Sequence, residues 1–173
     1  MKNKFIFLAV LLLLFSADVS AQKQSAAAFV RSFYEFHRAR SGAFNAGEVN
    51  SRKKWFTAEL NRLFQSELKR EKEYLKQNPT DKPHFGDGFP FLPYEECSKD
   101  GKGFKNVLKT GTETIRKSLT IVEVKIFQPK ACGGELTATY KVELVKIKNG
   151  WLINDWIYDD GKRLSDDLKR AEY

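Results

Sequence analysis

Residues 149–158 read NGWLINDWIY, and this stretch predicts how the second half of the chain folds. Asn149-Gly150 is the strongest short signal for a tight β-hairpin turn. The apolar run after it therefore predicts a strand that returns antiparallel to the strand before the turn. Asp155 lies inside this run, so the stretch also raises the question of why a carboxylate occupies a strand that should be buried.

Three explanations for Asp155 are open. With regular strand pairing, it shares one face with Ile153 and Ile157. The acid lines a polar cavity, accepts hydrogen bonds as a structural anchor, or reaches solvent through a twist of the strand. Because a buried carboxylate without partners is costly, we favour the anchor and keep the cavity as the alternative.

Two earlier stretches, 117–127 (KSLTIVEVKIF) and 135–148 (ELTATYKVELVKIK), alternate apolar and polar residues. A period of two predicts strands with one buried face. In the second stretch the apolar positions shift after Leu144 to Val145, which predicts a β-bulge at that point. Together with 149–158, the pattern predicts three or four antiparallel strands.

The first half of the chain has helical spacing. Ser25 is predicted to cap a helix over 26–40, and Thr57 a second helix. Glu67 and Glu71 are expected on the solvent side of that second helix.

Residues 79–104 form a long loop with four of the five prolines, and it holds the aromatic residues Phe85, Phe89, Phe91 and Tyr94. Disordered segments contain few aromatic residues, so this loop is predicted to be ordered and packed by its own rings. A short helix capped by Ser165 is predicted near the end of the chain. Helices followed by antiparallel strands predict an α+β fold with the helices on one face of a bent sheet.

The N-terminus predicts export. Lys2 and Lys4 precede an unbroken apolar run over residues 5–15, and small residues follow up to Ala21. This is the pattern of a cleaved signal peptide over 1–21, and the apolar run is too short to span a bilayer. Residues 22–173 are then one domain, periplasmic or secreted, with no membrane span. No cysteine follows the apolar run, so no lipid anchor is expected.

The charges of the chain are dispersed. Residues 1–21 hold two of the 30 basic and one of the 22 acidic residues, so the mature chain has a net charge of +7. Acidic residues interrupt most of the basic groups, which favours a solvated basic surface over a nucleic-acid site. We expect no nucleic-acid partner.

The two cysteines, Cys97 and Cys132, predict one disulfide, because an even number of cysteines in an exported chain is most simply paired. No local motif pairs either cysteine with a histidine for catalysis, and the spacing of Cys and His does not fit a zinc site. We expect no metal and no cofactor.

Several stretches together resemble one family. They are FVRSFYEFH (29–37), WFTAELNRLF (55–64), GDGFPF (86–91) and LVKIKNGWLINDWIY (144–158) followed by DLK (167–169). They resemble the YbjP/YqhG-like family of small exported bacterial proteins of unknown function, over roughly residues 26–170.

The resemblance implies a fold similar to nuclear transport factor 2 and ketosteroid isomerase, in which a curved antiparallel sheet wraps around helices as a cone with a cavity. Two features depart from the family. Its members often carry a lipid-attached cysteine after the signal, and the loop at 86–91 is longer than the Gly-Asp-Pro-Phe expected there. The resemblance implies a fold and a compartment, and it supplies no catalytic residues.

The implied cavity gives a candidate pocket. A carboxylate such as Asp155 can act as a general base only beside a group that stabilises the charge it creates, and Tyr34, His37 and Tyr140 are the candidate partners. The loop is the second candidate. There, Asp87 between two glycines is interpreted as a turn residue, with Phe89 and Phe91 as candidate contact residues.

Three functions of different classes are open. We favour a non-enzymatic binding or accessory domain that recognises a protein or envelope component through the cone mouth and the loop, because the sequence has no catalytic triad, phosphate loop or acid pair with local spacing. The alternative is a small-ligand carrier or a cavity enzyme with Asp155 in the pocket. An immunity-type inhibitor of a secreted toxin fits the size and the export equally well.

Overall fold

The computed structural model describes residues 24–40, 42–86, 88–91, 97–99, 102–104 and 106–170, with only the backbone for 97–99, 102–104 and 112. The predicted signal peptide therefore lies outside the described residues. The elements follow the order α2 (Ala26–Arg38), α3 (Ala46–Arg52), η1 (Lys53–Trp55), α4 (Ala58–Gln77), β1 (Cys97–Lys99), β2 (Lys102–Phe104), β3 (Val107–Arg116), β4 (Leu119–Phe127), η2 (Lys130–Cys132), β5 (Leu136–Ile147), β6 (Gly150–Ile157) and α5 (Leu164–Asp167).

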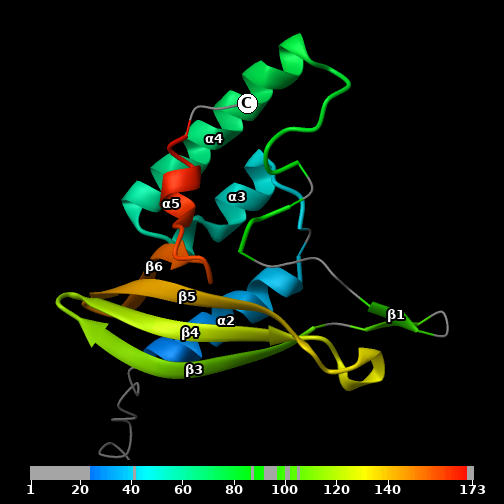
Figure 1. The fold of residues 1–173 in the computed structure, drawn as a ribbon. Helices are drawn as coiled ribbons and strands as arrows, with labels where there is room; N and C mark the ends of the chain where they lie inside the picture. Colours follow the sequence, from blue (N-terminus) through cyan, green and yellow to red (C-terminus); the bar gives the residue numbers. More distant parts are fainter. Residues whose placement is uncertain are drawn as a thin grey trace, which may run out of the picture.

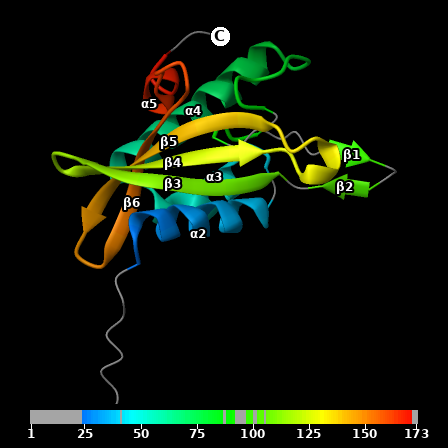
Figure 2. The same cartoon turned by 60° about the horizontal axis from the view of Figure 1, so that its bottom comes forward.

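The predicted α+β class is confirmed. Strands β3, β4, β5 and β6 form one antiparallel sheet in chain order, and β1 pairs with β2 in a separate hairpin. Helix α2 packs against β3 and β4, while α4 and α5 contact β6 (Figure 1). Figure 2 shows α2 lying along one face of the sheet, with the β1–β2 hairpin beyond its end.

The helix caps follow the sequence. The Ser25 hydroxyl accepts a hydrogen bond from the Ala28 amide, and the Thr57 hydroxyl accepts one from Leu60. Side-chain acceptors at this position satisfy amides that the first helical turn leaves open. The cap predicted at Ser165 is wrong, because α5 begins at Leu164 and Ser165 lies inside it.

The β-bulge lies in a different strand from the one predicted. Strand β5 pairs with β4 without interruption from Ala138 to Val145. The register shift falls between β5 and β6, where Glu143 faces Asp155 and Leu144 faces Ile153. Asn154 is therefore the extra residue, and it belongs to β6. The bulge brings Ile153 and the ring of Trp156 into the same core, although they are three residues apart.

The core between sheet and helices is filled by aromatic rings. Phe33 of α2 contacts Phe56, Phe91 and Trp156 with ring centroids 5.5–5.6 Å apart. Phe91 and Trp156 stack with centroids 4.4 Å apart. Rings of this size bury a large apolar area, and tilted or offset pairs are the favoured arrangements.

The outer edge of β6 is covered. Phe56 forms a parallel bridge with Ile153, and the Thr57 amide donates to the Ile153 carbonyl at 2.9 Å. Arg163 forms a bridge with Ile157 further along the same edge. Main-chain pairing of this kind satisfies groups that an edge strand otherwise exposes. In the part of the chain that the structure describes, no helix is both long and apolar enough to cross a bilayer.

Candidate functional site

Asp155 is buried, with 2% of its surface exposed, and it is fully hydrogen-bonded. Its Oδ1 accepts from the amides of Trp156 at 2.9 Å and Ser165 at 3.0 Å. Its Oδ2 accepts from Arg163 Nε at 2.8 Å and from the Ser165 hydroxyl at 2.7 Å. The carboxylate thus fastens the start of α5 to β6, which is the structural anchor favoured from the sequence.

A second acid lies beside this anchor. Glu143 of β5 is paired with Asp155 on the neighbouring strand β6, and its Oε2 is 3.0 Å from Arg163 Nη2. Its Oε1 accepts from the Asn154 side chain at 2.7 Å, so the bulge residue is also held. Arg163 bridges two carboxylates on neighbouring strands. Because every oxygen of both acids has a donor, this cluster is suited to holding structure.

Tyr34 lies in the core and not at a pocket. Its hydroxyl accepts from Trp156 Nε1 at 3.1 Å and donates to the Phe91 carbonyl at 3.1 Å. Burial raises the pKa of this hydroxyl far above its usual value, and the hydrogen bond from Trp156 opposes the rise only in part. Tyr34 therefore stays neutral and joins α2, β6 and the 85–91 loop.

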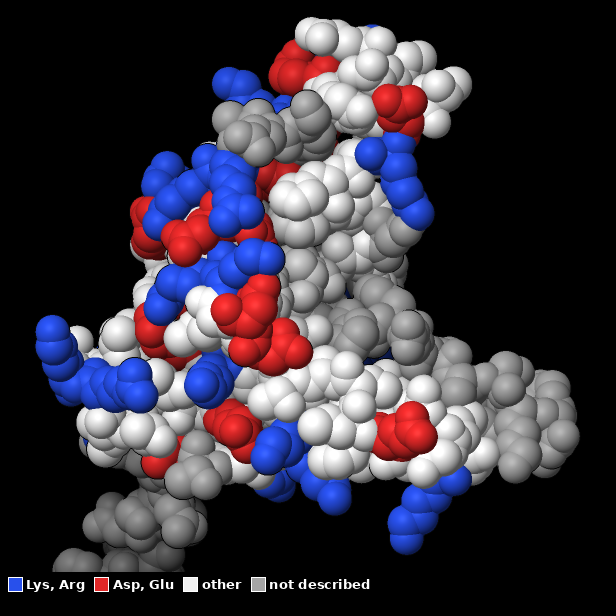
Figure 3. All heavy atoms as spheres, in the orientation of Figure 1, with Lys and Arg blue, Asp and Glu red and all other residues white. Residues whose placement is uncertain are grey.

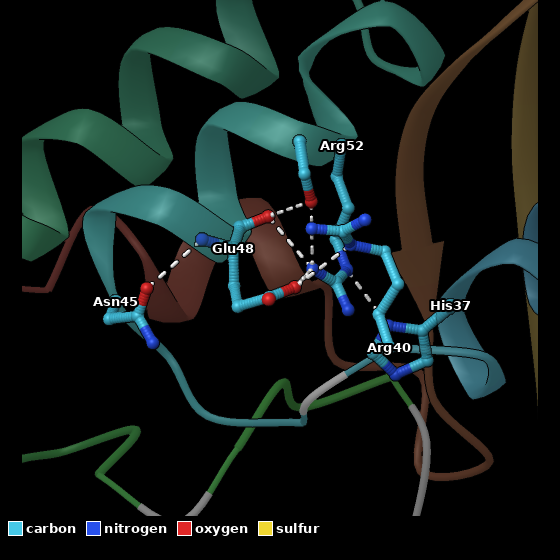
Figure 4. Close-up of polar contacts among 6 residues, drawn as sticks. His37, Arg40, Asn45, Glu48 and Arg52 are labelled. Carbon is cyan, nitrogen blue, oxygen red and sulfur yellow. Dashed lines mark hydrogen bonds and ion pairs between the residues drawn. The ribbon is translucent and has the colours of Figure 1, made fainter.

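His37 belongs to a buried polar network, drawn in Figure 4. Its Nδ1 accepts from Arg52 Nε at 2.9 Å. Because a guanidinium can only donate, Nδ1 must be unprotonated and the ring proton is on Nε2. Burial, followed by the positive charge of Arg52, lowers the pKa of His37 to about 3. The imidazole is consequently neutral at pH 7.

Arg52 is a buried cation on α3, with no exposed surface. Its Nη1 lies 2.6 Å from Glu48 Oε2 and donates to the Glu48 carbonyl at 2.8 Å. The guanidinium carbon lies 4.4 Å from the centre of the Phe89 ring. The hydrogen bond from Arg52 lowers the pKa of Glu48 and keeps it ionised. A buried charge persists when it is paired in this way, so the network locks α3 between α2 and the loop.

Of the residues of the predicted pocket, Tyr140 lines a hollow formed by described residues. The hollow has a volume of about 430 Å³ and opens to solvent between β5, the turn after β6 and α5. We call it the tyrosine hollow, because Tyr140 and Tyr158 form its aromatic part, with ring centroids 5.8 Å apart and planes at 71°. The volume lies within the range of small-molecule sites. The structure does not bring Asp155, Tyr34 and His37 into it.

The rim of the tyrosine hollow is charged. Asp159, Asp160 and Asp167 line it together with Lys162 and Arg170. Lys162 Nζ lies 2.8 Å from Asp160, and Arg170 Nη1 lies 3.6 Å from Asp167. In Figure 3 the acidic and basic side chains gather together over α5 and the adjacent part of α4.

Carboxylates also act on the two tyrosines. Burial, then the charge of Asp159, raises the pKa of Tyr140 to about 12. Burial also raises the pKa of Tyr158, with a further contribution from Asp167. Both hydroxyls are therefore neutral donors at physiological pH.

Two acids of α4 lie behind this region and are buried, contrary to the prediction. Glu67 accepts from Arg70 and lies 3.2 Å from His84 Nδ1. Glu71 accepts from the Phe85 amide at 2.7 Å, and burial raises its pKa. The loop after α4 folds back over this helix face and covers both carboxylates. His84 lines the tyrosine hollow, so the loop contributes to its wall.

The loop prediction is right in one part and wrong in another. Phe85, Phe89 and Phe91 are buried, as expected for a loop packed by its rings. The proposed role of Phe89 and Phe91 as contact residues is wrong, because both rings are part of the core and a partner cannot reach them. Asp87 lies outside the described residues, so its interpretation as a turn residue stays a prediction.

The disulfide prediction can be checked for one of its two cysteines. Cys132 is disulfide-bonded, and no described cysteine is free. Strand β1, which begins at Cys97, contacts η2, which ends at Cys132. The side chain of Cys97 lies outside the described part of the structure, so the Cys97–Cys132 pair itself stays a prediction.

No protein-family model matches this chain, and no curated protein or solved structure matches it either. Among the described residues, no group of three or more His, Cys, Asp or Glu side chains is placed to hold a metal ion.

Proposed function

We propose that this protein is an exported binding domain that recognises a small ligand, or a small group on an envelope component, in the tyrosine hollow. The observation that carries the proposal is the contrast between two sets of polar side chains. Asp155, Tyr34 and His37 are occupied by hydrogen bonds inside the fold. Tyr140, Tyr158 and the acids beside them face a hollow that is open to solvent.

The shape of the hollow supports binding more than catalysis. Its turn is held by its own hydrogen bonds, since the Tyr158 amide donates to the Lys162 carbonyl at 2.9 Å and the Lys162 amide donates to Asp160 at 2.9 Å. A wall fixed before the ligand arrives lowers the ordering cost of binding. The tyrosine hydroxyls have raised pKa values and are poor bases at neutral pH.

We also propose the finer fold that the resemblance implies. Helices in the first half followed by four antiparallel strands fit a cone of the nuclear transport factor 2 type, and the YbjP/YqhG-like family is the proposed relationship. In this interpretation, the aromatic core fills the interior of the cone, and the tyrosine hollow lies beside the sheet, next to β5 and the turn after β6. Export rests on the signal-like N-terminus.

The test of this function uses immobilised chain 22–173 and an extract of the cell envelope, with mass spectrometry of captured proteins and of co-purifying small molecules. We expect capture by the wild type, its loss in the Tyr140→Phe/Tyr158→Ala double variant, and its retention in Tyr74→Ala. Tyr74 is a tyrosine of α4 that does not line the hollow. Retention of capture by a folded double variant would exclude the hollow as the binding site.

A further inference from the structure

The tyrosine hollow has one carboxylate whose charge is not matched. Asp160 and Asp167 face Lys162 and Arg170, which are the two cations of the rim. Asp159 forms no ion pair with any residue that the structure describes. Its Oδ1 accepts only the Asp160 amide at 2.9 Å, which is a bond inside the turn. The hollow therefore has a net negative charge beside its aromatic wall.

The aromatic wall suits a positive ligand. The rings of Tyr140 and Tyr158 meet at 71°, so they form two sides of a corner. The face of an aromatic ring is negative and attracts a cation within about 6 Å of its centre. Asp159 lines the hollow together with both rings, so its carboxylate lies near this corner. An anion would find both rim cations already paired.

Building on the proposed function, we infer that the tyrosine hollow binds an organic ammonium group, with Tyr140 and Tyr158 around the cation and Asp159 as its counter-ion. A hydrated inorganic ion gains little from ring faces, whereas an alkylammonium group is weakly hydrated and contacts rings and carboxylate at once. The hollow of about 430 Å³ has room for such a group and the chain that bears it.

The test uses choline chloride as the probe and 3,3-dimethyl-1-butanol as its uncharged counterpart of the same shape, with chain 22–173 observed by NMR in 0.1 M NaCl. We expect choline to shift the ring signals of Tyr140 and Tyr158 in a saturable manner, and the alcohol to bind at least tenfold more weakly. Equal affinity for the two probes, or shifts that sodium chloride reproduces, would overturn the inference.

Two variants with the same loss of charge sharpen the test. Asp159→Asn keeps the acceptor for the Asp160 amide, so the turn should stay folded, and we expect a Kd for choline about five- to tenfold higher. Asp81→Asn removes the same charge from an exposed site that does not line the hollow, and it should bind choline as the wild type does. Equal weakening by both variants would mean that only the overall field matters and would overturn the site.

The inference and the proposed function fail in different ways. If choline does not bind while the tyrosine variants lose the captured partner, the hollow is a binding site for another chemistry and the ammonium inference is overturned. If choline binds in the hollow while the tyrosine variants keep the captured partner, the ammonium site stands and the proposed recognition of that partner through the hollow is overturned.

Discussion

Replacing Asp155 with alanine should destabilise the fold through one set of named hydrogen bonds. The carboxylate accepts four, from the Trp156 and Ser165 amides, the Ser165 hydroxyl and Arg163. The two amides lose an acceptor in a region shielded from water, at about 1 kcal/mol or more each. Arg163 keeps Glu143 at 3.0 Å, and the hydroxyl can rotate, so these two contribute less. We expect a loss of about 2–4 kcal/mol in the free energy of unfolding.

Asp155→Asn removes the negative charge but keeps the size of the side chain and one acceptor oxygen. The amide oxygen can still accept from both backbone amides, whereas the amide nitrogen faces Arg163 and the Ser165 hydroxyl. We therefore expect a loss of about 1–2 kcal/mol, roughly half that of the alanine variant. Asp81→Ala is the control, because this exposed acid accepts a hydrogen bond from Tyr74 and anchors no buried amide. Its effect should stay below about 0.5 kcal/mol.

The assay is urea unfolding of the oxidised protein, followed by tryptophan fluorescence and by circular dichroism. The midpoint should fall in the order wild type, Asp155→Asn, Asp155→Ala, with the slope against urea unchanged. An alanine variant with the wild-type midpoint would refute the reasoning. So would an asparagine variant as unstable as alanine, because the loss would then come from the charge alone and not from the backbone amides.

Three further predictions concern processing, oxidation and pH. N-terminal sequencing of exported protein should begin at Gln22, and an intact Met1 on a membrane-embedded protein would contradict the signal peptide. Non-reducing mass spectrometry should find a peptide that joins Cys97 to Cys132, and two alkylated thiols in unreduced protein would exclude the pair. The pKa of His37 is about 3 in the folded protein and 6.5 in the unfolded chain, so folding favours the neutral imidazole. The contribution of His37 to the free energy of unfolding is therefore complete above pH 6.5. It declines as the pH falls from 6.5 towards 3, by about 1.5 kcal/mol between pH 6.5 and 5. Unfolding experiments over this pH range should show that His37→Gln lacks this part of the pH dependence. If the free energy of unfolding changed with pH equally in the two proteins, the buried neutral imidazole would be contradicted.

Local chemistry made part of the fold predictable. The caps at Ser25 and Thr57 and the hairpin turn before the last strand depend on a few neighbouring residues, and the structure has all three features. The turn lies one residue earlier than predicted, because Gly150 already pairs with Ile147 and the two turn residues are Lys148 and Asn149. Strand alternation likewise identified β4 and β5. Helix α3 was missed because seven residues cover only two turns and show no apolar period that differs from a loop.

Features that depend on pairing between distant segments were not predictable. A shift in apolar period shows that two strands lose register, but it does not tell which strand has the extra residue. Here the apolar Ile147 is 43% exposed on a stretch of β5 that pairs regularly with β6, and Asn154 of β6 bulges instead. The burial of Glu67 and Glu71 has the same origin, because their helix face is covered only by the loop that follows α4.

The candidate site shows where sequence reasoning stops. Tyr140 was a candidate for the pocket as a partner of Asp155, and the sequence did not fix its position. Tyr158 and Asp159 were missed, although they directly follow β6 and precede Gly161, which has a positive φ of 83°. The signal was a tyrosine and two acids in a tight turn directly after the last strand. Only the pairing of β5 with β6 brings that turn next to Tyr140.

The acid inside the last strand and the hollow beside it are parts of one arrangement. Asp155 holds Arg163 and Ser165, and the chain between Asp155 and Arg163 is the turn that contains Tyr158 and Asp159. The carboxylate therefore ties the residues that follow this turn back to the strand that precedes it. An apolar residue at this position could not accept these hydrogen bonds and would leave Arg163 and Ser165 without this partner. The carboxylate in NGWLINDWIY thus stabilises a turn that forms part of the wall of the tyrosine hollow, because its own oxygens are occupied by hydrogen bonds inside the fold.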